Sequence, residues 1–299
     1  MRKIIFTVAF ILASFISAHA ENKTKVYDFG DIRSLDVGHL YRVHVTEGTS
    51  GKVRVEYDSK FEDNMEIKYN EENGRLSIMM SDNILRSITL RKSNSNTNQS
   101  PINVYLEMDK ISDINLSGAC NVTFEGNYKV DDLDVELSGA SKLVGLNISG
   151  RSLEMDCSGA CSCTIGGELK EYIELDGSGA VKLNYLGNCN SFSAEISGAS
   201  KLYASIKCKK IDISCQGASK AEVIGSAEEA DYECSGASAI VAKELVAKKV
   251  KASLSGASKA EVHAAENLSY MVSKASKIIY YGTPILKNIS IDNNVIQGE

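Results

Sequence analysis

Residues 192–203, Phe-Ser-Ala-Glu-Ile-Ser-Gly-Ala-Ser-Lys-Leu-Tyr, carry the pattern that decides the fold. Apolar and polar residues alternate before the central Ser-Gly-Ala, and the alternation resumes after it. A period of two places successive side chains on opposite faces of an extended strand, so it indicates a half-buried β-strand on each side. Ser and Gly are typical turn residues, and we expect Gly198 to adopt a positive φ or to allow close packing.

The same unit recurs along most of the chain. Seven copies read Ser-Gly-Ala, and Gln216-Gly217-Ala218 and Ser273-Lys274-Ala275 continue the series. The central residue advances by 18 to 21 positions each time, so the period is about 19–20 residues over nine units. Lys274 stands where the other units have Gly, although a left-handed Lys costs roughly 1–2 kcal/mol. The expected structural turn glycines are Gly118, Gly139, Gly159, Gly179, Gly198, Gly217, Gly236 and Gly256.

The repeat predicts a β-solenoid. A helical repeat does not fit an apolar period of two, and a propeller blade needs about 40 residues. A unit of strand and turn of this length suits one coil of a parallel β-helix, with coils about 4.8 Å apart. We therefore predict an all-β, single-stranded parallel β-helix of about nine 19–20-residue coils with an N-terminal β cap. Its handedness does not follow from the pattern, and a right-handed coil is favoured.

The N-terminal third lacks the Ser-Gly-Ala mark but keeps the alternation. Residues 41–45, 53–57 and 76–79 are expected strands, and the Asn/Ser-rich run at 93–100 is an expected loop. We divide the chain into a signal peptide at 1–20, a strand-rich cap continuous with the rod at 26–110, β-helix repeats at 111–285, and a tail at 286–299.

The first residues predict export. Arg2 and Lys3 precede an apolar run, and Ala18-His19-Ala20 forms an A-x-A cleavage site, so we expect the mature chain to start at Glu21. The run is too short to span a membrane. The expected location is the periplasm, the outer cell surface or the medium. Removing Arg2 and Lys3 changes the net charge from −6 to −8.

Composition and residue types argue against several classes of function. With 33 basic and 39 acidic residues and no Trp, the chain lacks the footprint of a nucleic-acid binder, and we expect no nucleic-acid partner. His39 and His44 are five residues apart, so they should face opposite sides of a strand and be solvated. No catalytic constellation or cofactor motif is present, and we expect neither catalytic residues nor a cofactor.

The eight cysteines fall on apolar positions of the repeat. Buried small hydrophobes are the favoured interpretation. Export would permit disulfides, and stacked pairs such as Cys215 with Cys234, or Cys189 with Cys208, have suitable spacing. The cluster Cys157-x3-Cys161-x-Cys163 does not have a zinc spacing, and we expect no metal.

Charges form columns when the units are aligned. Lysines occur three positions after the central residue, and acids such as Glu136, Asp156, Asp176 and Glu195 precede it. A solvated face that keeps the strands soluble is the favoured interpretation. The functional alternatives are that the acids bind Ca²⁺ or that the lysines engage an anionic glycan or surface polymer. The candidate binding stripe is Lys142, Lys182, Lys201, Lys220, Lys259 and Lys277.

The combined motifs resemble a known family. Phe29-Gly30-Asp31-Ile32 at the start, the Ser-Gly-Ala units, and residues 279–284 at the end are similar to the putative auto-transporter adhesin family with the head GIN domain, found in secreted proteins of Bacteroidetes-type bacteria. The resemblance covers roughly residues 26–285. It implies a parallel β-helix, export and an adhesin-like role, and it brings no catalytic motif.

We therefore expect an exported, non-enzymatic, adhesin-like protein whose partner is a surface glycan or another envelope protein. The alternatives are a polysaccharide-active β-helix enzyme and a periplasmic protein that binds a lipid or a partner. The enzyme would need acids with Lys or Arg in a cleft formed by a long insertion, and the repeats lack such an insertion.

Overall fold

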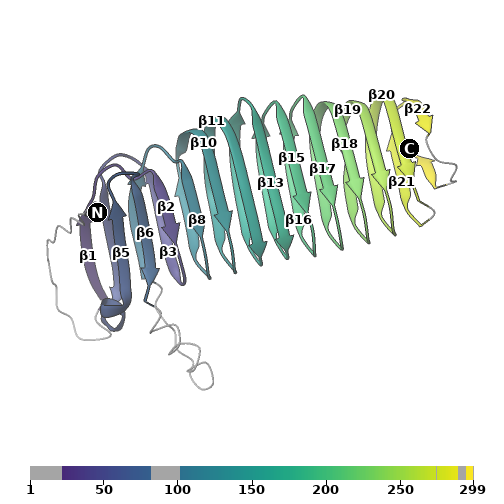
Figure 1. The fold of residues 1–299 in the computed structure, drawn as a ribbon. Coiled ribbons are helices and arrows are strands. Elements are labelled where there is room, and N and C mark those ends of the chain that lie inside the picture. Colours follow the sequence, from purple (N-terminus) through teal and green to yellow (C-terminus); the bar gives the residue numbers. More distant parts are fainter. Residues whose placement is uncertain (1–21, 82–101, 274, 289–293, 299) are drawn as a thin grey trace, which may run out of the picture.

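The computed structural model describes residues 22–81, 102–273, 275–288 and 294–298, which form a long rod of stacked β-rungs (Figure 1). The expected signal peptide with its cleavage site, the loop at 93–100 and the turn residue Lys274 lie outside the described residues. The predicted all-β parallel solenoid with about 20 residues per turn is confirmed. Its handedness and the domain ranges stay predictions.

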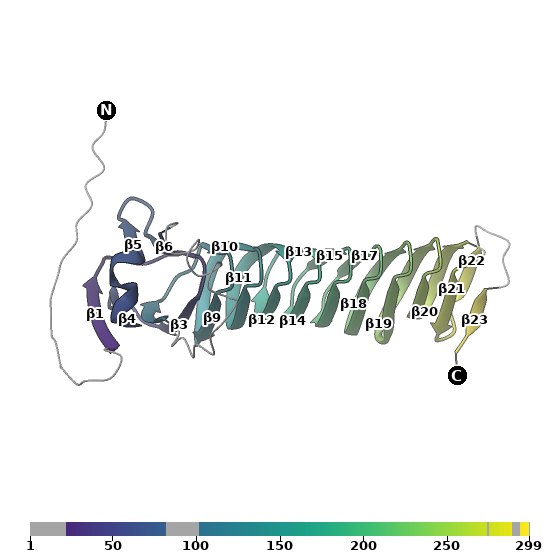
Figure 2. The same cartoon turned by 90° about the horizontal axis from the view of Figure 1, so that it is seen from below.

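Each rung has two strands, one before and one after the Ser-Gly-Ala turn, and these build two faces of the rod (Figure 2). The pre-turn face contains β8 (Asp113–Leu116), β13 (Tyr172–Gly179), β15 (Ser191–Ile196), β17 (Lys210–Cys215) and β22 (Ile285–Asn288). The post-turn face contains β9 (Asn121–Glu125), β12 (Ser162–Leu169), β14 (Lys182–Asn188), β16 (Lys201–Lys207), β21 (Lys277–Tyr281) and β23 (Val295–Gln297). Strands that continue around the second bend are β10 (Asn127–Leu137), β11 (Lys142–Gly159), β18 (Lys220–Cys234), β19 (Ala239–Leu254) and β20 (Lys259–Val272).

Equivalent residues of successive rungs lie directly beside one another. Leu175 pairs with Met155 on one side and with Ala194 on the other, and all three are buried. The apolar columns thus form one continuous core between the two faces. Each fully buried Leu or Ile contributes roughly 1.5–3 kcal/mol, so the alternation in sequence supplies the main stabilising free energy of the rod.

The N-terminal strands are threaded out of sequence order. The rung made by β2 (Ser34–Val37) and β3 (Tyr41–Glu47) lies between the β8/β9 rung and a rung made by β6 (Arg75–Met80) and β7 (Ile102–Met108). Parallel stacking therefore already includes residue 34. Antiparallel strands close this end together with a short 3-10 helix, namely β1 (Asn22–Asp28), β4 (Lys52–Asp58), β5 (Met65–Asn70) and η1 (Ser59–Asn64).

The placement of the first two histidines differs from the expectation. His39 lies in the β2–β3 turn with φ +70°, where the repeats have Gly, and its Nδ1 accepts from the Met80 amide at 3.3 Å. His44 lies on β3 and stacks on Tyr105 with ring centroids 5.0 Å apart. The prediction that both lie on one strand is wrong, because His39 occupies the turn; both side chains are half-buried.

Turn glycines are required for two reasons. Gly139 has φ +75°, and a Cβ there would lie 2.5 Å from the Gly118 carbonyl oxygen of the rung beside it. The Ala140 amide donates to the same carbonyl at 2.6 Å, which joins the turns into a hydrogen-bonded ladder. The same left-handed backbone occurs at Gly118, Gly159, Gly179, Gly198, Gly217, Gly236 and Gly256.

All eight cysteines are buried, unpaired thiols. Cys215 and Cys234 are direct partners on adjacent rungs. Burial raises the pKa of the Cys157 thiol to about 12 and also raises the pKa of Cys163. These thiols are therefore protonated at neutral pH and pack as small apolar side chains.

Candidate binding faces

The six candidate lysines lie in one ladder on the outer side of the post-turn face. Lys182 pairs with Lys201, and Lys201 pairs with Lys220, so three ammonium groups occupy successive rungs. Ser162 separates this group from Lys142, and Ala239 separates it from Lys259 and Lys277. All six side chains are exposed.

Most of this positive charge has no acidic partner. Lys220 Nζ lies 3.5 Å from Glu222 and Lys259 Nζ lies 2.6 Å from Glu261. No ion pair within the described ranges involves the remaining four, Lys142, Lys182, Lys201 and Lys277. Like charges placed side by side across strands are destabilising, by roughly 0.2–1 kcal/mol for each pair. The protein thus maintains a local concentration of positive charge although its net charge is negative.

The pre-turn face carries the opposite charge. Glu136, Asp156, Asp176 and Glu195 form a ladder of direct partners. Together with the turn serines, they line an open groove of about 440 Å³ that crosses several rungs. Sequence reasoning missed these serines as groove residues, because each stands in the turn motif itself; they are Ser138, Ser158, Ser178 and Ser197.

Crowding of the carboxylates on this face affects their pKa values. Burial raises the pKa of Asp176, and the neighbouring charges of Glu195 and Asp156 raise it further. Burial and then Glu154 raise the pKa of Asp134 on the same face. Ionisation of Asp176 and Asp134 is therefore opposed, since burial disfavours the charged form and the neighbouring carboxylates repel it.

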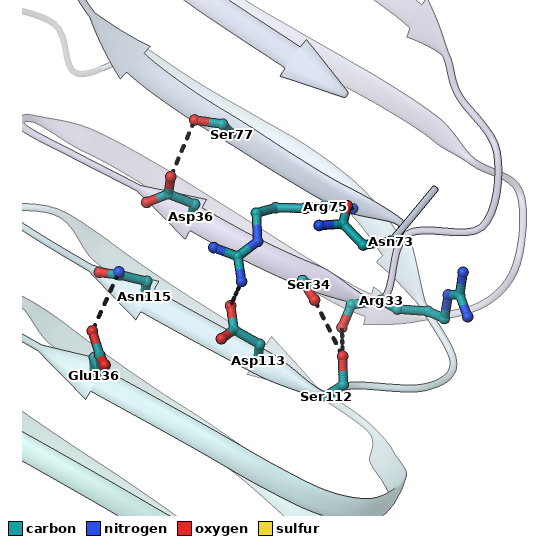
Figure 3. A network of polar contacts seen from close by, with 10 residues as sticks. All are labelled: Arg33, Ser34, Asp36, Asn73, Arg75, Ser77, Ser112, Asp113, Asn115 and Glu136. Atoms are coloured by element: carbon teal, nitrogen blue, oxygen red, sulfur yellow. Dashed lines mark hydrogen bonds and ion pairs between the residues drawn. The ribbon is translucent and has the colours of Figure 1, made fainter. Parts of the chain in front are cut away.

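The acids at the N-terminal end of this face have polar partners (Figure 3). The Arg75 guanidinium pairs with Asp113 at 2.8 Å, and the Ser77 hydroxyl donates to Asp36 at 3.3 Å. The Asn115 amide donates to Glu136 at 3.5 Å and links this network to the groove. The part of the ladder without a polar side-chain partner in the described structure therefore begins at Asp156.

The described residues contain no group of three or more His, Cys, Asp or Glu placed to hold a metal ion. This applies to the Cys157–Cys163 cluster and to the acidic ladder that had suggested Ca²⁺. No helix found in the described ranges is long and apolar enough to cross a membrane.

A regular two-faced rod with oppositely charged outer columns defines this molecule as a charge-striped parallel β-solenoid. The chain belongs to the family described as putative auto-transporter adhesin, head GIN domain, whose model matches residues 31–182 and 171–284. The resemblance drawn from the sequence motifs is thereby confirmed. Membership of an adhesin family suggests a location outside the cytoplasm.

Solved structures with similarity to this chain come from Parabacteroides and Bacteroides species. A putative adhesin from Parabacteroides merdae is 14% identical with a TM-score of 0.49, covering 93% of this chain and 97% of that chain. A putative lipid binding protein from Parabacteroides distasonis is 15% identical with a TM-score of 0.47 and the same coverage. A putative adhesin from Bacteroides fragilis is 17% identical with a TM-score of 0.30, covering 95% and 98%. No curated protein matches the sequence.

Proposed function

We propose that this chain is an exported, non-enzymatic, adhesin-like protein that binds an anionic glycan or surface polymer through its lysine ladder. The observation that carries the proposal is the run Lys182, Lys201 and Lys220 on adjacent rungs, of which the first two have no acidic partner in the described structure. A linear polyanion laid along the rod can contact successive lysines about 4.8 Å apart.

Charge geometry also favours a polymer over a small anion. An isolated exposed lysine contributes little to binding, because solvent screens its charge. Several lysines in a row bind the same polymer molecule together. At anionic lipid surfaces each lysine contributes about 1 kcal/mol to the free energy of binding. Three lysines at that value correspond to about a hundredfold in affinity.

Two alternatives lead to different outcomes. A polysaccharide-active enzyme would cut the polymer, and the acidic groove is where such activity would be sought; its lining residues include no Lys or Arg. A periplasmic protein that binds a lipid or partner would be inaccessible from outside the cell. Protease added to intact cells degrades a surface protein and spares a periplasmic one.

The binding test uses the mature chain and immobilised anionic and neutral polysaccharides at low salt. We expect binding to the anionic polymers, and a loss of at least about a hundredfold when Lys182, Lys201 and Lys220 are each changed to Glu. The matched control changes the exposed Lys129, Lys170 and Lys243 to Glu, which gives the same net charge away from the ladder.

Wild-type affinity in the ladder variant, or equal loss in the control, would overturn the proposal. Shortening of a polysaccharide during incubation with the protein would instead establish the enzyme alternative. Chain length measured by gel filtration of the polymer provides that readout.

A further inference from the structure

A second hollow lies along the bend opposite the Ser-Gly-Ala turns. It is an open groove of about 600 Å³ that crosses the rungs from β14 to β20. We call it the bend groove, and the residues that matter for its chemistry are Cys189, Lys207, Cys208, Lys209, Ala227 and Val246. It is separate from the lysine ladder and from the acidic groove.

The bend groove exists because the corner side chains become small. In earlier rungs Val130 and Leu169, both buried, fill this corner on either side of Gly150. Asn188 pairs with Glu168, so the next residue, Cys189, follows Leu169 in the column. Cys208 and Ala227 continue it. Replacing a leucine by a cysteine or alanine without moving the backbone leaves empty space, since protein interiors are otherwise closely packed.

The floor of the groove is apolar. Cys189, Cys208 and Ala227 are each 8% exposed, so only their outer surface reaches solvent. Val246 is 42% exposed beside them. An apolar occupant would cover all four and remove them from water.

The rim of the groove is positively charged. Lys207 and Lys209 are exposed, and within the described residues neither forms an ion pair. Glu228, the acid in the lining, forms an ion pair with Lys248, whose Nζ lies 3.7 Å from Glu228 Oε1. Two cations beside an apolar floor complement a ligand that has one anionic end and one apolar part.

An unpartnered donor lies beneath the floor. Tyr232 is 1% exposed, and its hydroxyl has no hydrogen-bond partner in the described structure. Burial and then the neighbouring Cys208 raise the pKa of Tyr232, so its hydroxyl lies within electrostatic range of this groove residue. In contrast, the hydroxyl of buried Tyr185 donates to the Gly167 carbonyl at 3.0 Å. A buried hydroxyl without a partner is costly to the folded state.

We propose that the bend groove binds a single-chain anionic amphiphile, a fatty-acid-like carboxylate. The carboxylate lies between Lys207 and Lys209, and the alkyl chain runs from Cys208 across Ala227 and Val246 toward Ala265. Three rung steps along the groove measure about 14 Å, which suits a chain of about twelve carbons. This site does not depend on the proposed polymer binding, because it uses other residues on another side of the rod.

The test measures binding of dodecanoate to the full mature chain, below the concentration at which it forms micelles, by displacement of a fluorescent fatty acid. We expect saturable binding of one molecule per chain. Ala227→Leu should weaken it by about tenfold or more, because leucine fills the corner as Leu169 does in an earlier rung. Ala237→Leu, on the exposed Ser-Gly-Ala turn, is the matched control and should bind as the wild type does.

A second variant keeps the result interpretable if Ala227→Leu fails to fold. Changing the exposed Lys207 and Lys209 to Gln should weaken dodecanoate binding about tenfold and leave binding of uncharged dodecanol unchanged. Lys129→Gln with Lys170→Gln is the control, since these lysines adjoin the filled corners Val130 and Leu169.

Absence of saturable dodecanoate binding below the micelle concentration would overturn the proposal. So would an equal loss of binding in the Lys207/Lys209 variant and the Lys129/Lys170 control. Neither result would bear on polysaccharide binding, which is measured separately.

Discussion

At the scale of single residues, the rod depends on positions where only one side chain size is compatible with the neighbouring rung. Gly179 has φ +102°, and a Cβ on it would lie 2.5 Å from the Gly159 carbonyl oxygen. Gly177, two residues earlier, faces the core, and its Cβ would meet side chains alone, those of Leu183 at 3.3 Å, Ile196 at 3.4 Å and Val181 at 3.8 Å. The two glycines in one turn therefore have different roles.

We expect Gly179→Ala to lower the free energy of unfolding by about 2 kcal/mol or more, since it adds left-handed strain to a backbone clash. Gly177→Ala is the control and should change it by less than about 1 kcal/mol, because flexible side chains can give way. Urea denaturation followed by circular dichroism measures both. Equal stability of the two variants would contradict this explanation of the turn.

The acidic ladder makes a prediction about pH. Burial and the charges of Glu195 and Asp156 raise the pKa of Asp176, so the ionised carboxylate destabilises the folded state. Asp176→Asn should therefore raise the free energy of unfolding at pH 7 by about 0.5 kcal/mol. As the pH falls through the folded-state pKa, Asp176 becomes protonated and the wild type is no longer destabilised by its charge. Below the ordinary pKa of 3.8, the stability difference between Asp176→Asn and the wild type should vanish. A gain that is constant with pH would exclude electrostatic repulsion as its source.

At the scale of elements, the sequence predicts the repeated rungs because the alternation of a strand and the Ser-Gly-Ala turn depend only on residues close together in the chain. The ladders follow from the regular spacing, so aligning the units is enough to place the six lysines in one column. The order β6–β2–β8 could not be predicted, since it depends on contacts between strands distant in sequence and His39 replaces the turn glycine. The bend groove was also missed, because Cys189, Cys208 and Ala227 lie at bends that have no repeated motif.

Removing one complete rung tests this modular construction. Deleting residues 199–217 joins Gly198 to Ala218, which occupies the equivalent place one rung later. We expect a cooperatively folding β-protein that is shorter by about 4.8 Å in small-angle X-ray scattering. Deleting residues 199–208 joins a turn to a bend, and should abolish cooperative unfolding measured by circular dichroism. Tolerance of the half-rung deletion would show that register does not matter.

At the scale of the whole molecule, the stacked rungs convert a simple repeat into long-range order of charge. The lysines lie on one face and the acids on the other, at a common axial spacing set by the backbone. The mature chain, with its expected net charge of −8, would be repelled by a polyanion if its charges were spread evenly. We therefore propose that the position of the lysines, and not their number, permits binding.

The most direct test moves these charges without changing their sum. Lys182, Lys201 and Lys220 are changed to Asn, and Ser193, Ser214 and Ser253 on the pre-turn face are changed to Lys. Affinity for an anionic polysaccharide is then measured beside the wild type at the same salt concentration. We expect a loss of about a hundredfold, as when three lysines are removed outright. Affinity equal to that of the wild type would contradict the proposed role of the lysine ladder.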